Sequence, residues 1–270
     1  MHHTSHALAI AERLAADLAP SALGVALFGS VAQGTDHPHS DIDLFVAVDD
    51  RTVDNRALED QAVEHDAVAA GPGTEIRQVD GRMVTLSRKT LTDLAGAFAN
   101  PWEAVVAVGA WRRARLLHDP DGHMARLQAQ ANAWTWDVIG PEADRWAAGE
   151  LVGLAEEVHK TYGMLARGRS RAAAANRAIL VLQLGYAMSV ANRLVCDSEN
   201  DLWDAVAAAE GPAWAEAWDA AAGVATVEHE AGCRAALALY RHAAARLEGH
   251  LEGEAKAVVR TACDLVKGTP

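Results

Sequence analysis

Two runs decide the fold, Gly24-Val25-Ala26-Leu27-Phe28-Gly29-Ser30 and Ser40-Asp41-Ile42-Asp43-Leu44-Phe45-Val46-Ala47-Val48. The first run is apolar over residues 24–28, which predicts a short buried strand that ends at its Gly-Ser pair. The second run begins with alternating polar and apolar residues, which predicts another strand over residues 41–48. A loop rich in Gly, Thr, Asp, His and Pro joins these two strands.

Weaker signals surround this stretch on both sides. Residues 5–18 place leucine and alanine on one helical face, and Pro20 ends that predicted helix. Downstream, the sequence predicts helical spacing over 52–70 and a hairpin over 74–87 turning at Asp80-Gly81. A helix over 102–113 and a last strand running into a turn over 116–122 follow.

Beyond residue 122 the pattern is helical throughout. Alanine, the best helix former, is abundant there, and the breaks fall at 140–141, 168–170, 197–200, 211–212 and near Thr226. The sequence therefore predicts two domains, a mixed α and β domain over 1–122 and a helical domain over 123–270.

The overall composition excludes several classes of protein. The net charge of −13 leaves no excess of lysine and arginine for a polynucleotide, so no nucleic-acid partner is expected. Three widely spaced cysteines form neither a disulfide framework nor a zinc motif. The chain shows no signal peptide and no long apolar span, which predicts a cytoplasmic protein without a membrane partner.

The two runs also contain the residues that could bind a metal or a phosphate. Residues two apart in a strand point to one face, so Asp41 and Asp43 project together, and a paired carboxylate of this kind suits Mg²⁺. Gly29 lets backbone N–H groups approach a phosphate, and the hydroxyl of Ser30 can donate to it. Together these residues predict a metal-bridged triphosphate site.

This pattern of an apolar-Gly-Ser strand followed by an Asp-x-Asp strand resembles the nucleotidyltransferase superfamily related to DNA polymerase beta. The resemblance implies an α+β fold, with a mixed sheet flanked by helices and two metal ions held by Asp41 and Asp43. That superfamily usually has a third carboxylate on a neighbouring strand. By register this position falls near Thr85, which is not a carboxylate, so Glu75 remains as a weak candidate that points to the opposite face.

A second resemblance, to the kanamycin nucleotidyltransferase family, extends over most of the chain. Glu156 and Lys160 lie one helical turn apart, and the residues alone are also compatible with a surface salt bridge. The resemblance implies that Glu156 is the general base and that Lys160 binds the nucleotide phosphates. It also implies a homodimer whose C-terminal helical domain binds the acceptor.

The leading functional hypothesis is magnesium-dependent transfer of AMP from ATP to a hydroxyl of a small, cationic, aminoglycoside-like acceptor, with a role in antibiotic resistance. The acidic charge suits such an acceptor. One alternative is an antitoxin-type nucleotidyltransferase that modifies a protein, although those are generally short single domains. Another is a non-catalytic nucleotide-binding module, motivated by the threonine at position 85, where the superfamily usually has a third carboxylate.

Overall fold

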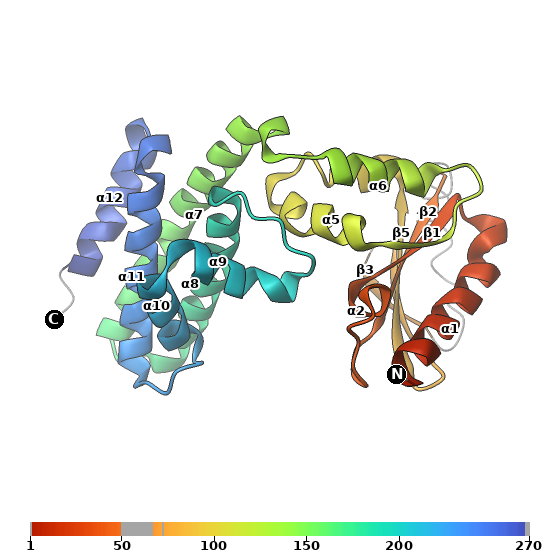
Figure 1. Cartoon of the computed structure of the whole chain (residues 1–270). Coiled ribbons are helices and arrows are strands. Elements are labelled where there is room, and N and C mark those ends of the chain that lie inside the picture. The colour runs from red at the N-terminus through yellow and green to blue at the C-terminus, as the bar shows by residue number, and fades with distance from the viewer. Residues whose placement is uncertain (1, 50–66, 72, 268–270) are drawn as a thin grey trace. The chain divides into compact units, whose positions relative to one another are not determined.

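The chain divides into two compact units, Met1–Thr135 and Trp136–Pro270, each described here by itself. The computed structural model describes residues 2–49, 67–71 and 73–267 (Figure 1). The sequence predicts the boundary after Gly122, whereas the structure divides after Thr135. The difference is α6 (His123–Ala133), which packs against α5 (Pro101–Arg113) and the first strand of the sheet.

The first unit is built on one mixed sheet of six strands in the order β3-β4-β5-β2-β1-β6. Only β2 and β5 run parallel to each other, and the remaining neighbours are antiparallel. The predicted mixed sheet is thus confirmed. The strands are β1 (Gly24–Phe28), β2 (Ile42–Val48), β3 (Ala67–Gly71), β4 (Thr74–Val79), β5 (Arg82–Thr90) and β6 (Arg115–His118).

The predicted helical spacing over 52–70 is wrong at its end, because residues 67–70 belong to β3. The rest of that prediction, up to residue 66, lies outside the described residues. The hairpin prediction is confirmed, since Val79 pairs with Arg82 across the two-residue turn. Asp80 and Gly81 have φ angles of 49° and 78°, the left-handed conformation that this tight turn requires.

One face of the sheet packs on α1 (His2–Leu18), as the apolar stripe of that helix predicts. Every residue of β1 is buried, and β2 alternates between buried and half-buried positions at its start. The side chains of Ile42, Leu44 and Leu86 therefore lie in the core with Ile10 and Leu14 of the helix. The residues that alternate with Ile42 and Leu44 along β2 point to the opposite face of the sheet, and Asp43 is one of them.

The opposite face is covered by α5 and α6. Phe28 of β1 meets Trp111 of α5 edge to face, with 4.9 Å between ring centroids, and meets Phe45 of β2 at 4.6 Å. Gly24 lies so close to Met124 of α6 that an added Cβ would be 2.5 Å from the Met124 Cγ. Two short helices complete the unit, α2 (Gly29–Gln33) and α4 (Leu91–Gly96).

In the second unit the described residues are helical and contain no strand, which confirms the predicted helical half. Its helices are α7 (Gly140–Ala166), α8 (Ser170–Ala191), α9 (Leu202–Glu210), α10 (Pro212–Ala222), α11 (His229–Leu247) and α12 (Gly253–Lys267). Short 3-10 turns are η1 (Ala19–Ser21) in the first unit and η2 (Trp136–Val138), η3 (Glu199–Asp201) and η4 (Glu248–His250) in the second.

The helices of the second unit pack mainly around α7, α8 and α11. The buried Tyr240 of α11 donates its hydroxyl to the Leu151 carbonyl of α7 at 3.0 Å, which fixes the two helices in register. Among the helices that the structure describes, none combines the length and the apolar character needed to cross a bilayer.

Candidate active site

The predicted carboxylate pair lies where β2 begins. Asp41 immediately precedes the strand and Asp43 is its second residue. Asp43 is flanked by Phe28 of β1 on one side and by Thr85 of β5 on the other. The two carboxylates share the face away from α1, and each lies close enough to act on the charge of the other.

The environment of Asp43 disfavours its charged form. Burial, and secondarily repulsion from Asp41, raises the pKa of the Asp43 carboxyl to about 6. A carboxyl held at this pKa is half protonated slightly below neutral pH, and a cation placed between the two groups would remove the repulsion. Perturbation of this kind by a neighbouring like charge is typical of functional sites.

Gly29 stands directly against this carboxylate. Its φ angle is +69°, and a Cβ added to it would lie 2.8 Å from the Asp43 Oδ2. Glycine is therefore required twice at this position, once for the left-handed backbone and once for the space that the carboxylate occupies. The predicted Gly29 and Asp43 are thus brought together by the pairing of β1 with β2.

Ser30 follows Gly29 in the first turn of α2, where backbone N–H groups lack helical partners. The Ser30 carbonyl accepts hydrogen bonds from Gly34 at the end of that helix and from the Thr35 N–H at 3.0 Å. These hydrogen bonds hold the first residues of the connection to the aspartates close to Ser30.

Thr85 occupies the position where the superfamily pattern places a third carboxylate. It is the direct β5 partner of Asp43. Glu75 pairs with Leu86 and so points to the opposite face, where it accepts a hydrogen bond from Arg88 at 2.8 Å and lies 3.6 Å from Arg77. The candidacy of Glu75 as a third ligand is therefore wrong, because its carboxylate is engaged by two arginines on the other side of the sheet.

Glu156 and Lys160 lie on α7 in the second unit. The Lys160 Nζ is 2.9 Å from the Glu156 Oε1 and 2.8 Å from the Glu157 Oε1. Hydrogen bonds to Glu157 and then to Glu156 raise the pKa of Lys160. Both glutamates share a helix face with Lys160, because a flexible lysine reaches carboxylates both three and four residues away.

The two glutamates differ in exposure. The side chain of Glu156 is 72% exposed and that of Glu157 only 14%.

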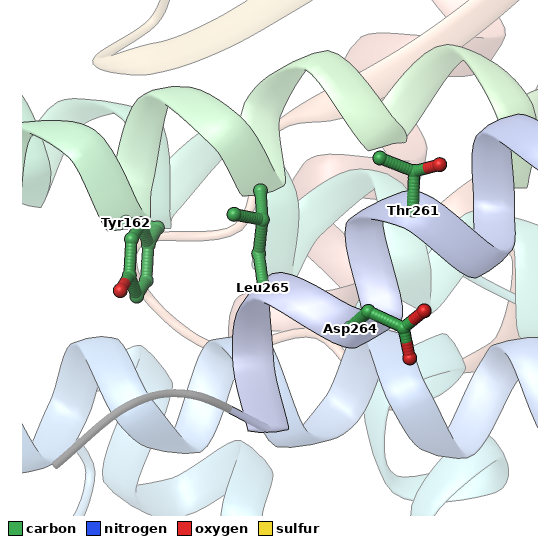
Figure 2. A pocket seen from close by; sticks show the side chains of 4 residues that line it. All are labelled: Tyr162, Thr261, Asp264 and Leu265. Atoms are coloured by element: carbon green, nitrogen blue, oxygen red, sulfur yellow. The ribbon is translucent and has the colours of Figure 1, made fainter.

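A separate hollow in the second unit is lined by Tyr162 of α7 and by Thr261, Asp264 and Leu265 of α12 (Figure 2). None of the residues selected from the sequence lines this hollow.

Comparison with known protein families identifies the first unit. A family model for the nucleotidyltransferase domain matches residues 10–78, a span that contains the Gly-Ser pair and both aspartates. This unit is a nucleotidyltransferase domain. The superfamily that the sequence resembles is thereby confirmed, and nucleotidyl transfer is its general activity.

This chain is also similar to solved protein structures. A nucleotidyltransferase-like protein from Exiguobacterium sibiricum is similar to this chain, at 14% identity and a TM-score of 0.49. The similarity covers 89% of this chain and 74% of that one. No curated protein matches the sequence.

Nucleotidyltransferase domains generally use a nucleoside triphosphate and a divalent metal, and the residues present fit such a metal. Asp41 and Asp43 offer hard carboxylate oxygens, and the raised pKa of Asp43 marks a repulsion that a cation would relieve. Within residues 2–49, 67–71 and 73–267, no group of three or more acidic, histidine or cysteine side chains could hold a metal. Triphosphate oxygens and water are ligands of the kind that a divalent metal at such a site also accepts.

Replacing Gly29 by alanine is expected to disturb the metal site of the nucleotidyltransferase more than its fold. The added Cβ would displace the Asp43 carboxylate and strain the backbone at φ +69°. We expect turnover to fall by about 10²-fold, the loss typical of a misplaced catalytic group. Gly34→Ala is the matched control, because its φ of +73° is similar and an added Cβ meets nothing within 4 Å. Equal losses of turnover in the two variants would contradict the steric argument.

The metal-free protein is expected to become less stable as pH rises through the titration of Asp43. Its folded pKa of about 6 lies above the ~3.9 of an unfolded aspartate, so folding favours the protonated form. Relative to Asp43→Asn, the wild type should therefore lose stability between about pH 4 and pH 6 and remain lower above that range. Thermal unfolding of both proteins at about pH 5 and about pH 7.5 tests this. A gap in Tm that does not widen at the higher pH would contradict the assigned environment.

Proposed function

We propose that this nucleotidyltransferase transfers AMP from ATP to a hydroxyl of a small, cationic, aminoglycoside-like acceptor, with Mg²⁺ as the metal and pyrophosphate as the second product. One observation carries the proposal, namely that the Asp43 carboxylate occupies the space left by the missing side chain of Gly29 and has Asp41 near enough to raise its pKa. Such a site accommodates a cation together with triphosphate oxygens.

Each candidate site residue of the first unit has a defined part in this proposal. Asp41 and Asp43 hold the divalent cation, which when bound offsets negative charge on the reacting phosphates. Gly29 keeps the backbone close to the triphosphate, and the Ser30 hydroxyl donates a hydrogen bond to a phosphate oxygen. The aromatic contact between Phe28 and Trp111 secures the end of β1 from which this turn departs.

The remaining roles rest on the resemblance to the kanamycin nucleotidyltransferase family. Glu156 takes the proton from the acceptor hydroxyl, and Lys160 binds the nucleotide phosphates. Lys160 is compatible with that role because its side chain is 44% exposed and its ammonium is charged at neutral pH. The net charge of −13 favours the approach of a polycationic acceptor.

The direct test is a screen of acceptors with ATP and Mg²⁺, in which pyrophosphate release and the mass of the product are followed together. Aminoglycosides should gain the mass of an adenylyl group with the wild type but not with Asp43→Asn. Adenylylation of a protein acceptor instead would favour the antitoxin-type alternative. The same reactions with the other nucleoside triphosphates establish the preferred base.

A second candidate, a non-catalytic nucleotide-binding module, is favoured by Thr85 beside Asp43, since the third carboxylate of the superfamily pattern is replaced there. Such a module would bind ATP with Mg²⁺ but release no pyrophosphate with any acceptor. Measuring nucleotide binding and pyrophosphate release on one preparation therefore separates the two functions.

The proposal also includes a homodimer in which two subunits contribute to each active site. Mixing inactive Asp43→Asn chains with inactive Glu156→Gln chains is expected to restore some turnover, because one site of each mixed dimer regains both groups. Asp43→Asn mixed with a second metal-site variant, Asp41→Asn, is the control and should restore none. A monomeric mass by light scattering under assay conditions would contradict the shared site.

A further inference from the structure

A buried ion pair joins the connection between Ser30 and Asp41 to the first residue of β5. Arg82 places its Nη2 3.3 Å from the Asp36 Oδ2, and their side chains are 8% and 0% exposed. The ion pair at the neighbouring turn, Arg13 with Asp80, has side chains that are 53% and 50% exposed. The two pairs thus attach to the same hairpin but differ sharply in burial.

Stability alone does not account for the buried pair. The Asp36 Oδ1 and the Arg82 Nε are both buried without a hydrogen-bond partner among the described residues. Taking two charges out of water is costly, and a buried pair whose remaining polar atoms are unsatisfied returns little of that cost. An apolar contact of similar volume would hold these segments together at least as well.

The position of Asp36 suggests what the pair does. Asp36 is in the middle of the connection that leads from Ser30 to Asp41. The beginning of that connection is fixed by the Thr35 N–H, which donates to the Ser30 carbonyl. Its end is fixed by His37 and Ser40, because the His37 N–H donates to the Ser40 Oγ and the Ser40 N–H donates to the His37 carbonyl.

Arg82 supplies the anchor for the middle of this connection. It is the first residue of β5 and lies two positions before Val84, the parallel partner of Ile42. The ion pair therefore ties the connection to β5 at the level where the chain enters β2. Asp41 immediately precedes that strand and Asp43 is its second residue, so their separation depends on how the connection is held.

We propose that Asp36 and Arg82 are positioning residues for the metal site, which hold the connection so that Asp41 and Asp43 present their carboxylates to one divalent cation. The inference rests on the metal role assigned under the proposed function. Neither residue touches the cation, and both act through the backbone that carries the two aspartates.

The test measures Mn²⁺ binding to the full chain without nucleotide, by the loss of the electron paramagnetic resonance signal of free Mn²⁺. Asp36→Asn and Arg82→Met should each weaken Mn²⁺ binding by about tenfold or more, the effect usual for residues that support metal ligands. Arg13→Met is the matched control, because it removes the exposed ion pair at the same hairpin, and its Mn²⁺ affinity should equal that of the wild type.

The double variant Asp36→Asn/Arg82→Met separates positioning from folding. Removing both charges leaves neither one buried and unpaired, so its Tm should recover relative to the less stable of the single variants. If it regains stability while Mn²⁺ still binds about tenfold more weakly, the positioning role is supported. If Mn²⁺ affinity returns together with Tm, or if the single variants bind Mn²⁺ like the wild type, the inference is overturned.

Asp43→Asn distinguishes this inference from the proposed function. Loss of Mn²⁺ binding in Asp43→Asn together with wild-type binding in Asp36→Asn would refute only the positioning role. Wild-type binding in Asp43→Asn would refute the metal assignment itself, and the positioning role would fall with it.

Discussion

Asp43→Asn is expected to lower turnover by about 10³-fold or more, because the divalent metal that we propose Asp43 holds would stabilise transition-state charge by several kcal/mol. Asparagine keeps the shape of the side chain and removes only the charge. It should also relieve the burial penalty and the repulsion from Asp41 that raise the pKa of Asp43. The variant should therefore be folded, no less stable than the wild type near neutral pH, and nearly inactive.

The measurement is the rate of pyrophosphate release with the acceptor identified by the screen, at saturating ATP and Mg²⁺. Asp17→Asn, which changes an exposed aspartate on α1, is the control and should retain full turnover. Turnover of Asp43→Asn within a few-fold of the wild type would remove Asp43 from the metal site.

Glu156→Gln is expected to lower kcat by ~10²–10⁴-fold, the contribution usual for a general base, with little change in nucleotide affinity. An alcohol is a weak nucleophile at neutral pH, and glutamine cannot accept its proton. The 72% exposure of Glu156 leaves its carboxylate accessible to a bound acceptor.

Glu157→Gln is the matched control, because Glu157 lies on the same helix and contacts the same lysine. Its side chain is largely buried and its Oε2 has no partner among the described residues, so this variant should alter Tm more than kcat. If Glu157→Gln is instead the variant with the large loss of kcat, the general base is Glu157 and the assignment to Glu156 is wrong.

The part of the fold that could be predicted from sequence is the part in which local pattern and tertiary role agree. The apolar run before Gly29 and the alternating run from Asp41 are both strands, and Asp80-Gly81 is the predicted turn. Helical spacing misled at residues 67–70, where pairing with β4 determines the conformation instead. The domain boundary also required tertiary contacts, because the sequence of α6 is helical whichever unit it joins.

In the candidate site, too, the sequence predicts what local geometry determines and misses what tertiary contacts or side-chain rotamers determine. The pairing of Glu75 with Leu86, which turns Glu75 away from the face of Thr85, follows from a two-residue turn and strand geometry, so the sequence predicts it correctly. The reach of Lys160 to Glu157 depends on the rotamer of a long side chain, which helix periodicity does not determine. The pair of Asp36 and Arg82 joins residues 46 positions apart, and no local pattern marks either of them.

The parallel pairing of β2 with β5 has a consequence for synthesis of the chain. The apolar strand Ile42–Val48 pairs on one side with β1, which precedes it, and on the other with β5, which begins only at Arg82. At a ribosomal rate of about 5–20 residues per second, the second edge of this strand stays open for a few seconds. An unpaired apolar edge is a template for aggregation, so a supply of chaperones that cover it during synthesis should raise the yield of folded protein.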